Sequence, residues 1–281
     1  WPHTYDWVYN KMWLENFFTL LEENSSWIKV KTFSEFIEES KSSGTVDIPT
    51  ASYIEMMEWS KGNFRNFFTK YPESNDMRNT MFYVSSKVNA LSAKKDKLNK
   101  PDLKVLDEAK RELYKGQCNC AYWHGIFGGI YLGYLRSSIY EKLINSEKLI
   151  DKIEHHKEKR WVSLSEADIN KDGFEEIVLS NPKVNLFINP KRGGVIYELD
   201  YKEKSLNLLN TLSRRPESYH EKLVNKNSVL SASYAGKVPR TIHDSIAPKE
   251  ENLDEILFYD KYRKAALIDH FFKKTELINN F

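Results

Sequence analysis

The chain has 281 residues, which is more than one compact core usually holds, so we expect two domains. Its composition, 41% hydrophobic and 29% charged, is typical of a globular protein and excludes a disordered, collagen-like or disulfide-framework chain. The formal net charge of +2 gives no electrostatic reason to expect a nucleic acid as partner.

The sequence also bears on where the protein works. Its longest uncharged apolar stretch, residues 125–135, is far shorter than the roughly 20 residues that a membrane helix needs, so we expect no membrane partner. Cys118 and Cys120 are separated by one residue and cannot close a useful loop. We therefore predict a cytoplasmic protein. Because the sequence opens at Trp1, without Met, we expect a piece of a longer polypeptide.

The first half of the chain reads as helical. Between residues 7 and 23 the apolar side chains recur at threes and fours, which predicts one amphipathic helix. Thr32 and Glu35 form a capping box that predicts a short helix through residue 40. Ser74 is a candidate cap for a helix that starts at Asn75. The further helices predicted by spacing are 52–60, 63–69, 75–98, 101–114 and 130–157.

After residue 159 the apolar period changes to two, which predicts strands. The predicted strands are 161–164, 176–179, 184–188 and 194–199. Helices first and strands afterwards predict an α+β protein, in which a helical bundle (1–157) precedes a β-rich domain (158–281). The strands are few for a closed antiparallel sandwich, so we expect an incomplete β-sandwich that is cut short.

The segment 117–129 is the densest collection of chemically useful residues. Tyr122, Trp123 and His124 could present an indole face and an imidazole to a sugar ring. Alternatively, its glycines admit a tight helix crossing in which the aromatic residues are core. Metal binding by Cys118, Cys120 and His124 is a third interpretation, but a structural zinc site would need a fourth ligand.

A second candidate site is the turn 168–176. Asp168, Asn170 and Asp172 alternate along it, Gly173 follows, and Glu176 stands at the ninth position, a pattern that suits a short calcium loop between two strands. The alternative is an Asp-Gly hairpin turn whose acids are merely solvated. Any calcium here would be structural.

The sequence gives little indication of other ligands or catalytic mechanisms. The aromatic content of 14% favours a sugar ligand only weakly. Spacing singles out no carboxylate pair for glycoside hydrolysis, and no phosphate loop, zinc-protease motif or serine-hydrolase motif occurs. The run Arg214 to Glu217 could bind an anion, although a surface salt network explains it as well.

Several stretches together resemble glycoside hydrolase family fifty-seven, the α-amylase and 4-α-glucanotransferase group. They are residues 1–9 (WPHTYDWVY), 49–59 (PTASYIEMMEW), 65–75 (RNFFTKYPESN), 117–129 (QCNCAYWHGIFGG), 192–200 (RGGVIYELD), 210–220 (NTLSRRPESYH) and 268–271 (IDHF). The resemblance extends over nearly the whole chain.

This resemblance implies a (β/α) barrel, a helical region and a β-domain, which together cleave or transfer α-1,4-glucan chains with retention of configuration. The nucleophilic Glu and the acid Asp lie on the barrel in that family, and the acid's motif ends at a Trp-Pro similar to Trp1-Pro2. The resemblance therefore implies that this chain holds no catalytic residue and lacks the barrel. It further implies that Tyr122, Trp123 and His124 close over the active site, that Trp1 walls the same cleft, and that the turn 168–176 binds Ca²⁺. No organic cofactor is implied.

The expected function is accordingly part of a 4-α-glucanotransferase. α-Amylase and amylopullulanase of the same family are the alternatives, and so is a non-catalytic module that binds glucan or braces a separate barrel. The expected partners are an α-1,4-glucan or maltooligosaccharide, a catalytic barrel upstream and a second copy of the chain in a homodimer.

Overall fold

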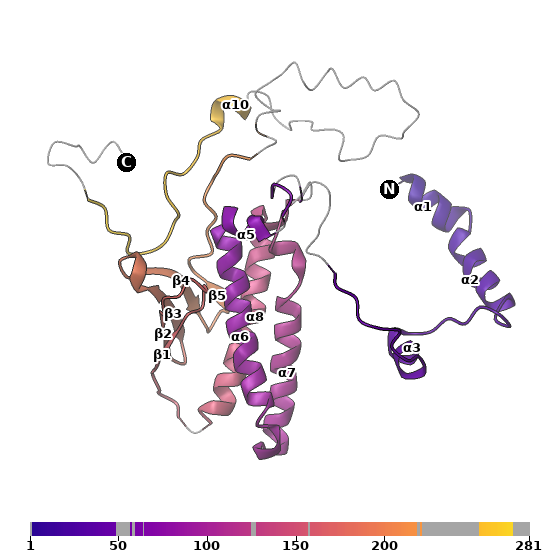
Figure 1. Cartoon of the computed structure of the whole chain (residues 1–281), viewed down its shortest axis with the longest axis horizontal. Coiled ribbons are helices and arrows are strands. Elements are labelled where there is room, and N and C mark those ends of the chain that lie inside the picture. Colours follow the sequence, from indigo (N-terminus) through magenta and orange to yellow (C-terminus); the bar gives the residue numbers. More distant parts are fainter. Residues whose placement is uncertain are drawn as a thin grey trace. The chain divides into compact units, whose positions relative to one another are not determined.

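The computed structural model describes residues 2–48, 57, 60–63, 65–124, 128–156, 158–217, 220 and 253–271. They belong to two compact units, Trp1–Pro49 and Thr50–Phe281, each with its own internal contacts (Figure 1).

The first unit consists of short helices joined by extended chain. Helix α1 (Pro2–Tyr5) runs into a π-helical turn (Asp6–Asn10), and α2 (Trp13–Glu23) and α3 (Phe33–Glu39) follow. The single helix expected over 7–23 is interrupted because Met12 adopts a left-handed φ of 56°. The capping box is confirmed: the Thr32 hydroxyl accepts a hydrogen bond from the Glu35 amide, and the Glu35 carboxylate accepts one from the Thr32 amide at 2.7 Å. None of the residues described in this unit is buried.

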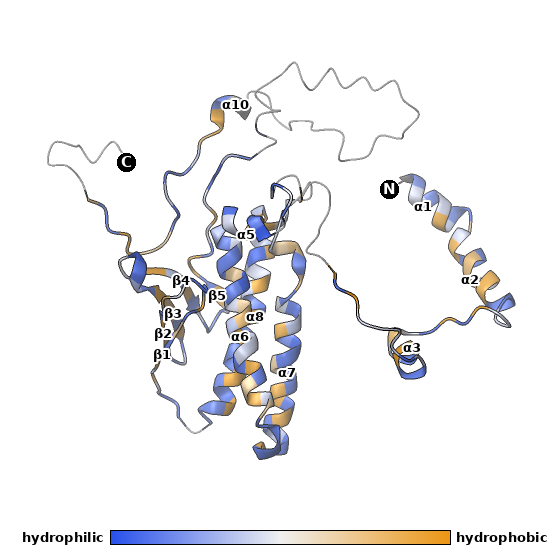
Figure 2. Ribbon diagram, in the orientation of Figure 1, coloured by the Kyte–Doolittle hydropathy of each residue, from blue (hydrophilic) through white to orange (hydrophobic). Residues whose placement is uncertain are grey.

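The second unit begins with a helical bundle. Helix α5 (Arg65–Lys70) precedes α6 (Pro72–Ser92), α7 (Lys100–Gly116) and α8 (Gly133–Glu154), and these three long helices lie side by side (Figure 1). Figure 2 shows apolar residues interspersed with polar ones along each of these helices, as expected for amphipathic helices. Their apolar stripes meet in one core that includes Met77, Val84, Leu106, Leu143 and Ile150.

The starts of these helices follow local rules. Pro72 occupies the first turn of α6, so the helix begins three residues before the expected Asn75 and Ser74 lies inside it. Asn99 caps α7, because its side-chain oxygen accepts a hydrogen bond from the Asp102 amide at 2.9 Å. Of the helices described, none is both long enough and apolar enough to cross a membrane.

The strands that follow form an antiparallel meander. Strands β1 (Ser163–Ala167), β2 (Glu176–Ser180), β3 (Val184–Asn189), β4 (Val195–Tyr201) and β5 (Leu206–Asn207) pair in chain order in one sheet. The predicted α+β class is confirmed, with helices first and an open sheet afterwards; β5 was not predicted. A short helix, α10 (Leu253–Ile256), is described beyond the sheet, and Ala266 pairs with Ile196 on β4.

The sheet meets the bundle through a mixed interface. Tyr83 of α6 packs edge-on against Phe187 of β3. Polar bonds flank this contact: the Thr80 hydroxyl donates to the Glu198 carboxyl at 2.7 Å, and the Asn185 amide donates to Glu147 at 2.9 Å. Residues 72–201 therefore build one continuous unit of helices and sheet.

Candidate functional site

Segment 117–129 leaves the end of α7 as a short 3₁₀ turn, Asn119–Ala121, and its two cysteines are exposed free thiols. Tyr122 comes next and belongs to the core of the bundle. Its hydroxyl donates to the Gly116 carbonyl at 2.6 Å, and burial raises the pKa of this phenol. Residues 125–127 lie outside the described part of the chain.

Trp123 is half-buried and packs against Phe67, Tyr71 and Ile130. Its carbonyl accepts a hydrogen bond from the Ile130 amide at 2.8 Å, which folds the segment back on itself. Gly129 makes this fold possible, because its φ is +49° and a Cβ there would lie 2.0 Å from the Trp123 carbonyl oxygen.

His124 is buried, with 1% of its surface exposed, between the rings of Phe67, Tyr71 and Tyr131. Its Nε2 lies 2.5 Å from the Tyr71 hydroxyl oxygen. Burial lowers the pKa of the imidazole to about 4, so the ring is neutral at neutral pH. In this arrangement the histidine contacts protein groups, and its predicted contact with a sugar stays a prediction.

The hydroxyl of Tyr71 leads on to Glu217, a buried acid 146 residues further along the chain. The Tyr71 hydroxyl oxygen lies 2.6 Å and 2.5 Å from the two carboxylate oxygens, Lys70 donates at 2.8 Å, and the Tyr131 hydroxyl donates as well. Burial acts to raise the pKa of Glu217, but the hydrogen bonds from Lys70, Tyr131 and Tyr71 outweigh it and hold the pKa below its ordinary value. Glu217 is therefore ionised at neutral pH.

The residues just before Glu217 are tied to neighbouring parts of the second unit. The Arg215 guanidinium bonds both carboxylate oxygens of Glu73 on α6, at 2.9 and 2.7 Å. Arg214 pairs with Asp260 at 2.9 Å. The salt network expected for this run is thus present, although half of it is sheltered and joins segments distant in sequence.

The predicted site residues are only partly brought together. Tyr122, Trp123 and His124 are consecutive, but the first and third are buried and Trp123 is the member with appreciable exposed surface. Trp1 lies outside the described residues. Sequence reasoning did not single out Tyr71, Lys70 or Tyr131 as site residues, and it considered Glu217 only as a member of the run Arg214 to Glu217. The one available signal was that residues 65–75 and 210–220 fell within stretches of family resemblance.

The turn 168–176 connects β1 to β2 and is closed by its own polar atoms. Asp168 accepts hydrogen bonds from the amides of Asp172 and Gly173, at 3.0 and 3.2 Å, and Asn170 accepts one from the Asp172 amide at 2.9 Å. Oxygens of this kind are the ligands that a hard cation such as Ca²⁺ uses. Here they accept hydrogen bonds from the turn's own amides, and the Lys191 ammonium lies 3.2 Å from the Asp172 carboxylate. Among the described residues, Asp168, Asp172 and Glu176 do not bring three ligand atoms close together.

Glu176, the fourth predicted ligand, is differently placed. Its buried carboxylate accepts hydrogen bonds from the Ile169 and Asn170 amides, the Asn170 side chain and the Asn189 side chain. Four N–H donors fill the acceptor positions of one carboxylate. Burial raises the pKa of Glu176 despite these bonds. Its role as a metal ligand stays a prediction, and what the structure describes is a residue that braces the turn.

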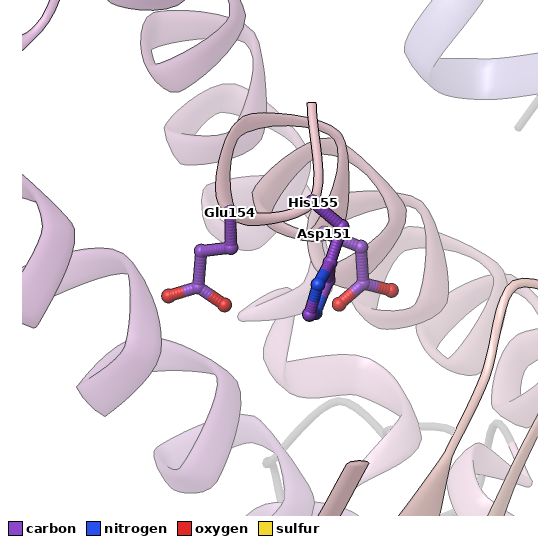
Figure 3. Close-up of side chains that lie close together, drawn as sticks. All are labelled: Asp151, Glu154 and His155. Atoms are coloured by element: carbon purple, nitrogen blue, oxygen red, sulfur yellow. The ribbon is translucent and has the colours of Figure 1, made fainter. Parts of the chain in front are cut away.

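Within the described residues, one group of three side chains has potential metal-ligand atoms close together: Asp151, Glu154 and His155 at the end of α8 (Figure 3). The ammonium groups of Lys202 and Lys87 lie 2.8 and 3.9 Å from the Asp151 carboxylate and repel a cation, so we assign no metal to this group. Cys118, Cys120 and His124 do not form such a group.

Comparison with known proteins identifies two domain profiles along the chain. The profile of the alpha-amylase/4-alpha-glucanotransferase middle domain matches residues 62–150, and that of the C-terminal domain matches residues 168–281. His124 and Tyr71 fall in the first match, and Glu217 falls in the second.

The curated relatives include alpha-amylase 1 of Dictyoglomus thermophilum, which is 36% identical over 100% of this chain and 42% of its own length. The 4-alpha-glucanotransferase of Thermococcus litoralis is 34% identical over 100% of this chain and 43% of its own length. Its crystal structure matches with a TM-score of 0.59 and 33% identity, over 100% of this chain and 41% of that one. The chain thus spans about two fifths of the length of the proteins that it matches.

Proposed function

The chain belongs to the α-amylase/4-α-glucanotransferase family, glycoside hydrolase family fifty-seven, and from this premise we propose that it is part of a retaining 4-α-glucanotransferase acting on α-1,4-glucans. The observation that carries the proposal is the order of the two family domains along one chain. His124, in the middle-domain match, is also connected through the Tyr71 hydroxyl to Glu217 in the C-terminal match. The catalytic Glu and Asp would be supplied by a barrel outside this chain.

Within such an enzyme this chain would contribute a wall of the glucan site. Trp123 is the residue of its triplet with surface available for a glucosyl ring, and stacking on an aromatic face positions the ring for reaction. Tyr122 and His124 would hold that indole in place from behind, because both are buried and hydrogen-bonded.

An α-amylase is the second candidate, because the Dictyoglomus relative carries that name and matches the whole chain at 36% identity. Hydrolysis and transfer share a glycosyl-enzyme intermediate and differ in whether water or a sugar hydroxyl accepts the glucosyl group. The products distinguish the two activities. Maltooligosaccharides both longer and shorter than the substrate indicate transfer, whereas the release of new reducing ends alone indicates hydrolysis.

The test is the substitution Trp123→Ala in the complete protein, assayed with maltooligosaccharides. Loss of one aromatic stacking contact should raise KM or lower turnover about tenfold. Trp161→Ala is the matched control, since that half-buried indole stacks on His155 and should leave turnover within about twofold. Unchanged turnover in Trp123→Ala would remove this residue from the site. Binding without any turnover in the unaltered complete protein would favour a non-catalytic module.

We also propose that Asp168, Asn170, Asp172 and Glu176 form a structural Ca²⁺ site and that the protein works in the cytoplasm. The alternation of oxygen-bearing side chains at positions 168, 170 and 172 supports the calcium proposal. Two exposed free thiols, Cys118 and Cys120, support a reducing compartment.

A further inference from the structure

A buried hydrogen-bond chain links three segments that are far apart in sequence. His124 stands between α7 and α8, Tyr71 lies between α5 and α6, and Glu217 follows the sheet. His124 Nε2 and the Tyr71 oxygen are 2.5 Å apart, and that oxygen lies 2.5 Å from Glu217 Oε2. The Tyr71 side chain is fully buried, so water does not compete for these bonds.

The positions of the protons in this chain follow from the chemistry of its members. An ionised carboxylate only accepts hydrogen bonds, so the single hydroxyl proton of Tyr71 must point at Glu217. The Tyr71 oxygen can then only accept from His124, which places the proton of the neutral imidazole on Nε2. Lys70 and Tyr131 donate to the same carboxylate and keep it charged. Nδ1 of His124 is left as the acceptor nitrogen of the ring.

We propose that Tyr71 and Glu217 are positioning residues, which hold His124 as the Nε2-protonated tautomer and thereby fix the Trp123–His124 segment for glucan binding. The part that concerns glucan rests on the proposed function. Because His124 is buried, its tautomer can affect a bound glucan only through the neighbouring Trp123. The Trp123 ring packs against the cluster that contains Tyr71, and its carbonyl accepts a hydrogen bond from the Ile130 amide. Because Glu217 belongs to the C-terminal domain match, the glucan wall of the middle domain depends on a side chain from the next domain.

Three conservative variants separate this role from simple packing. Tyr71→Phe keeps the ring and removes the middle link. Glu217→Gln keeps the shape of the side chain but can donate to Tyr71, which lets the Tyr71 hydroxyl turn towards His124. Tyr201→Phe is the matched control, because it removes a tyrosine hydroxyl from an exposed carboxylate, that of Glu203, outside this hydrogen-bond chain. Thermal unfolding of each variant identifies any that fails to fold.

The first readout is ¹⁵N NMR of the histidine side chains in this chain, with the His124 signals assigned by their absence in His124→Gln. We expect an Nε2-protonated, neutral ring in the unaltered chain and in Tyr201→Phe. Tyr71→Phe and Glu217→Gln should shift the signals towards the other tautomer. An unaltered His124 signature in both of these variants would overturn the proposal.

The second readout is kinetics of the complete protein with maltoheptaose. Losing one buried hydrogen bond in the chain should raise KM about three- to tenfold in Tyr71→Phe and Glu217→Gln, with a smaller change in kcat. Tyr201→Phe should stay within about twofold of the unaltered protein. Equal KM changes in all three variants would overturn the positioning role. If the unaltered protein neither binds nor converts maltoheptaose, the proposed function fails, and the NMR readout still decides the positioning role.

Discussion

Glu198 and Asp200 are two acids whose burial costs folding free energy. Both point from β4 into the interface with the bundle and are fully buried, and one oxygen of each has no hydrogen-bond partner among the described residues. Burial raises the pKa of Glu198 well above its ordinary value, and the charge of Asp200 adds to this. Burial together with the charge of Glu147 does the same for Asp200, although Lys202 partly opposes the shift.

These raised pKa values fix the sign of a pH dependence. Between the ordinary carboxyl pKa and the raised one, the folded state keeps protons that the unfolded state has released. Stability therefore falls as pH rises through that window. Glu198→Gln replaces the acid by a neutral amide that can still bond Thr80, so the variant should lose part of this dependence.

The measurement is the Tm of the chain at about pH 5 and about pH 8. The drop between the two should be smaller by a few degrees in Glu198→Gln than in the unaltered chain, since about 1 kcal/mol corresponds to roughly 2–4 °C in a domain of this size. Glu166→Gln is the control, because Glu166 is exposed on β1 and should leave the drop unchanged. Equal drops in all three proteins would contradict the prediction.

At the scale of the element, the turn between β1 and β2 invites a metal test. If Ca²⁺ binds the oxygens of Asp168, Asn170 and Asp172, it stabilises the folded state by mass action, by about 2.7 kcal/mol at a hundredfold excess over Kd. The Tm should therefore be several degrees higher in excess calcium than in excess chelator. Asp168→Asn should abolish the difference, whereas Asp96→Asn, in an exposed turn, should keep it. The same Tm in calcium and in chelator would exclude a stabilising site.

The long helices were predictable because their evidence is local. The stripes of α6, α7 and α8 repeat every three or four residues, and Thr32 and Glu35 stand three residues apart. Helix α6 begins earlier than expected because Pro72 occupies its first turn. A proline can end one helix or start the next, and the sequence pattern alone does not distinguish the two. The hydrogen-bond chain through Glu217 could not be predicted from the sequence. The partners of Glu217, which are Lys70, Tyr71 and Tyr131, lie 86 to 147 residues away, and no spacing rule connects them.

At the scale of the whole molecule, the two units differ in what stabilises them. All three apolar core clusters of the described residues draw their members from positions 67–212. The first unit instead exposes large apolar side chains, with Trp27 74%, Phe33 90% and Ile37 72% exposed. Residues 2–48, the described part of this unit, include no buried side chain, so they contribute no apolar core.

Deleting residues 1–49 tests this division of stability. The shortened chain should keep a cooperative unfolding transition with a Tm within about 2 °C of the full chain, because every core cluster remains intact. Binding of a dye that reports exposed apolar surface should fall sharply, because the exposed aromatic residues of α2 and α3 are removed with the segment. A large loss of Tm on deletion would contradict the prediction.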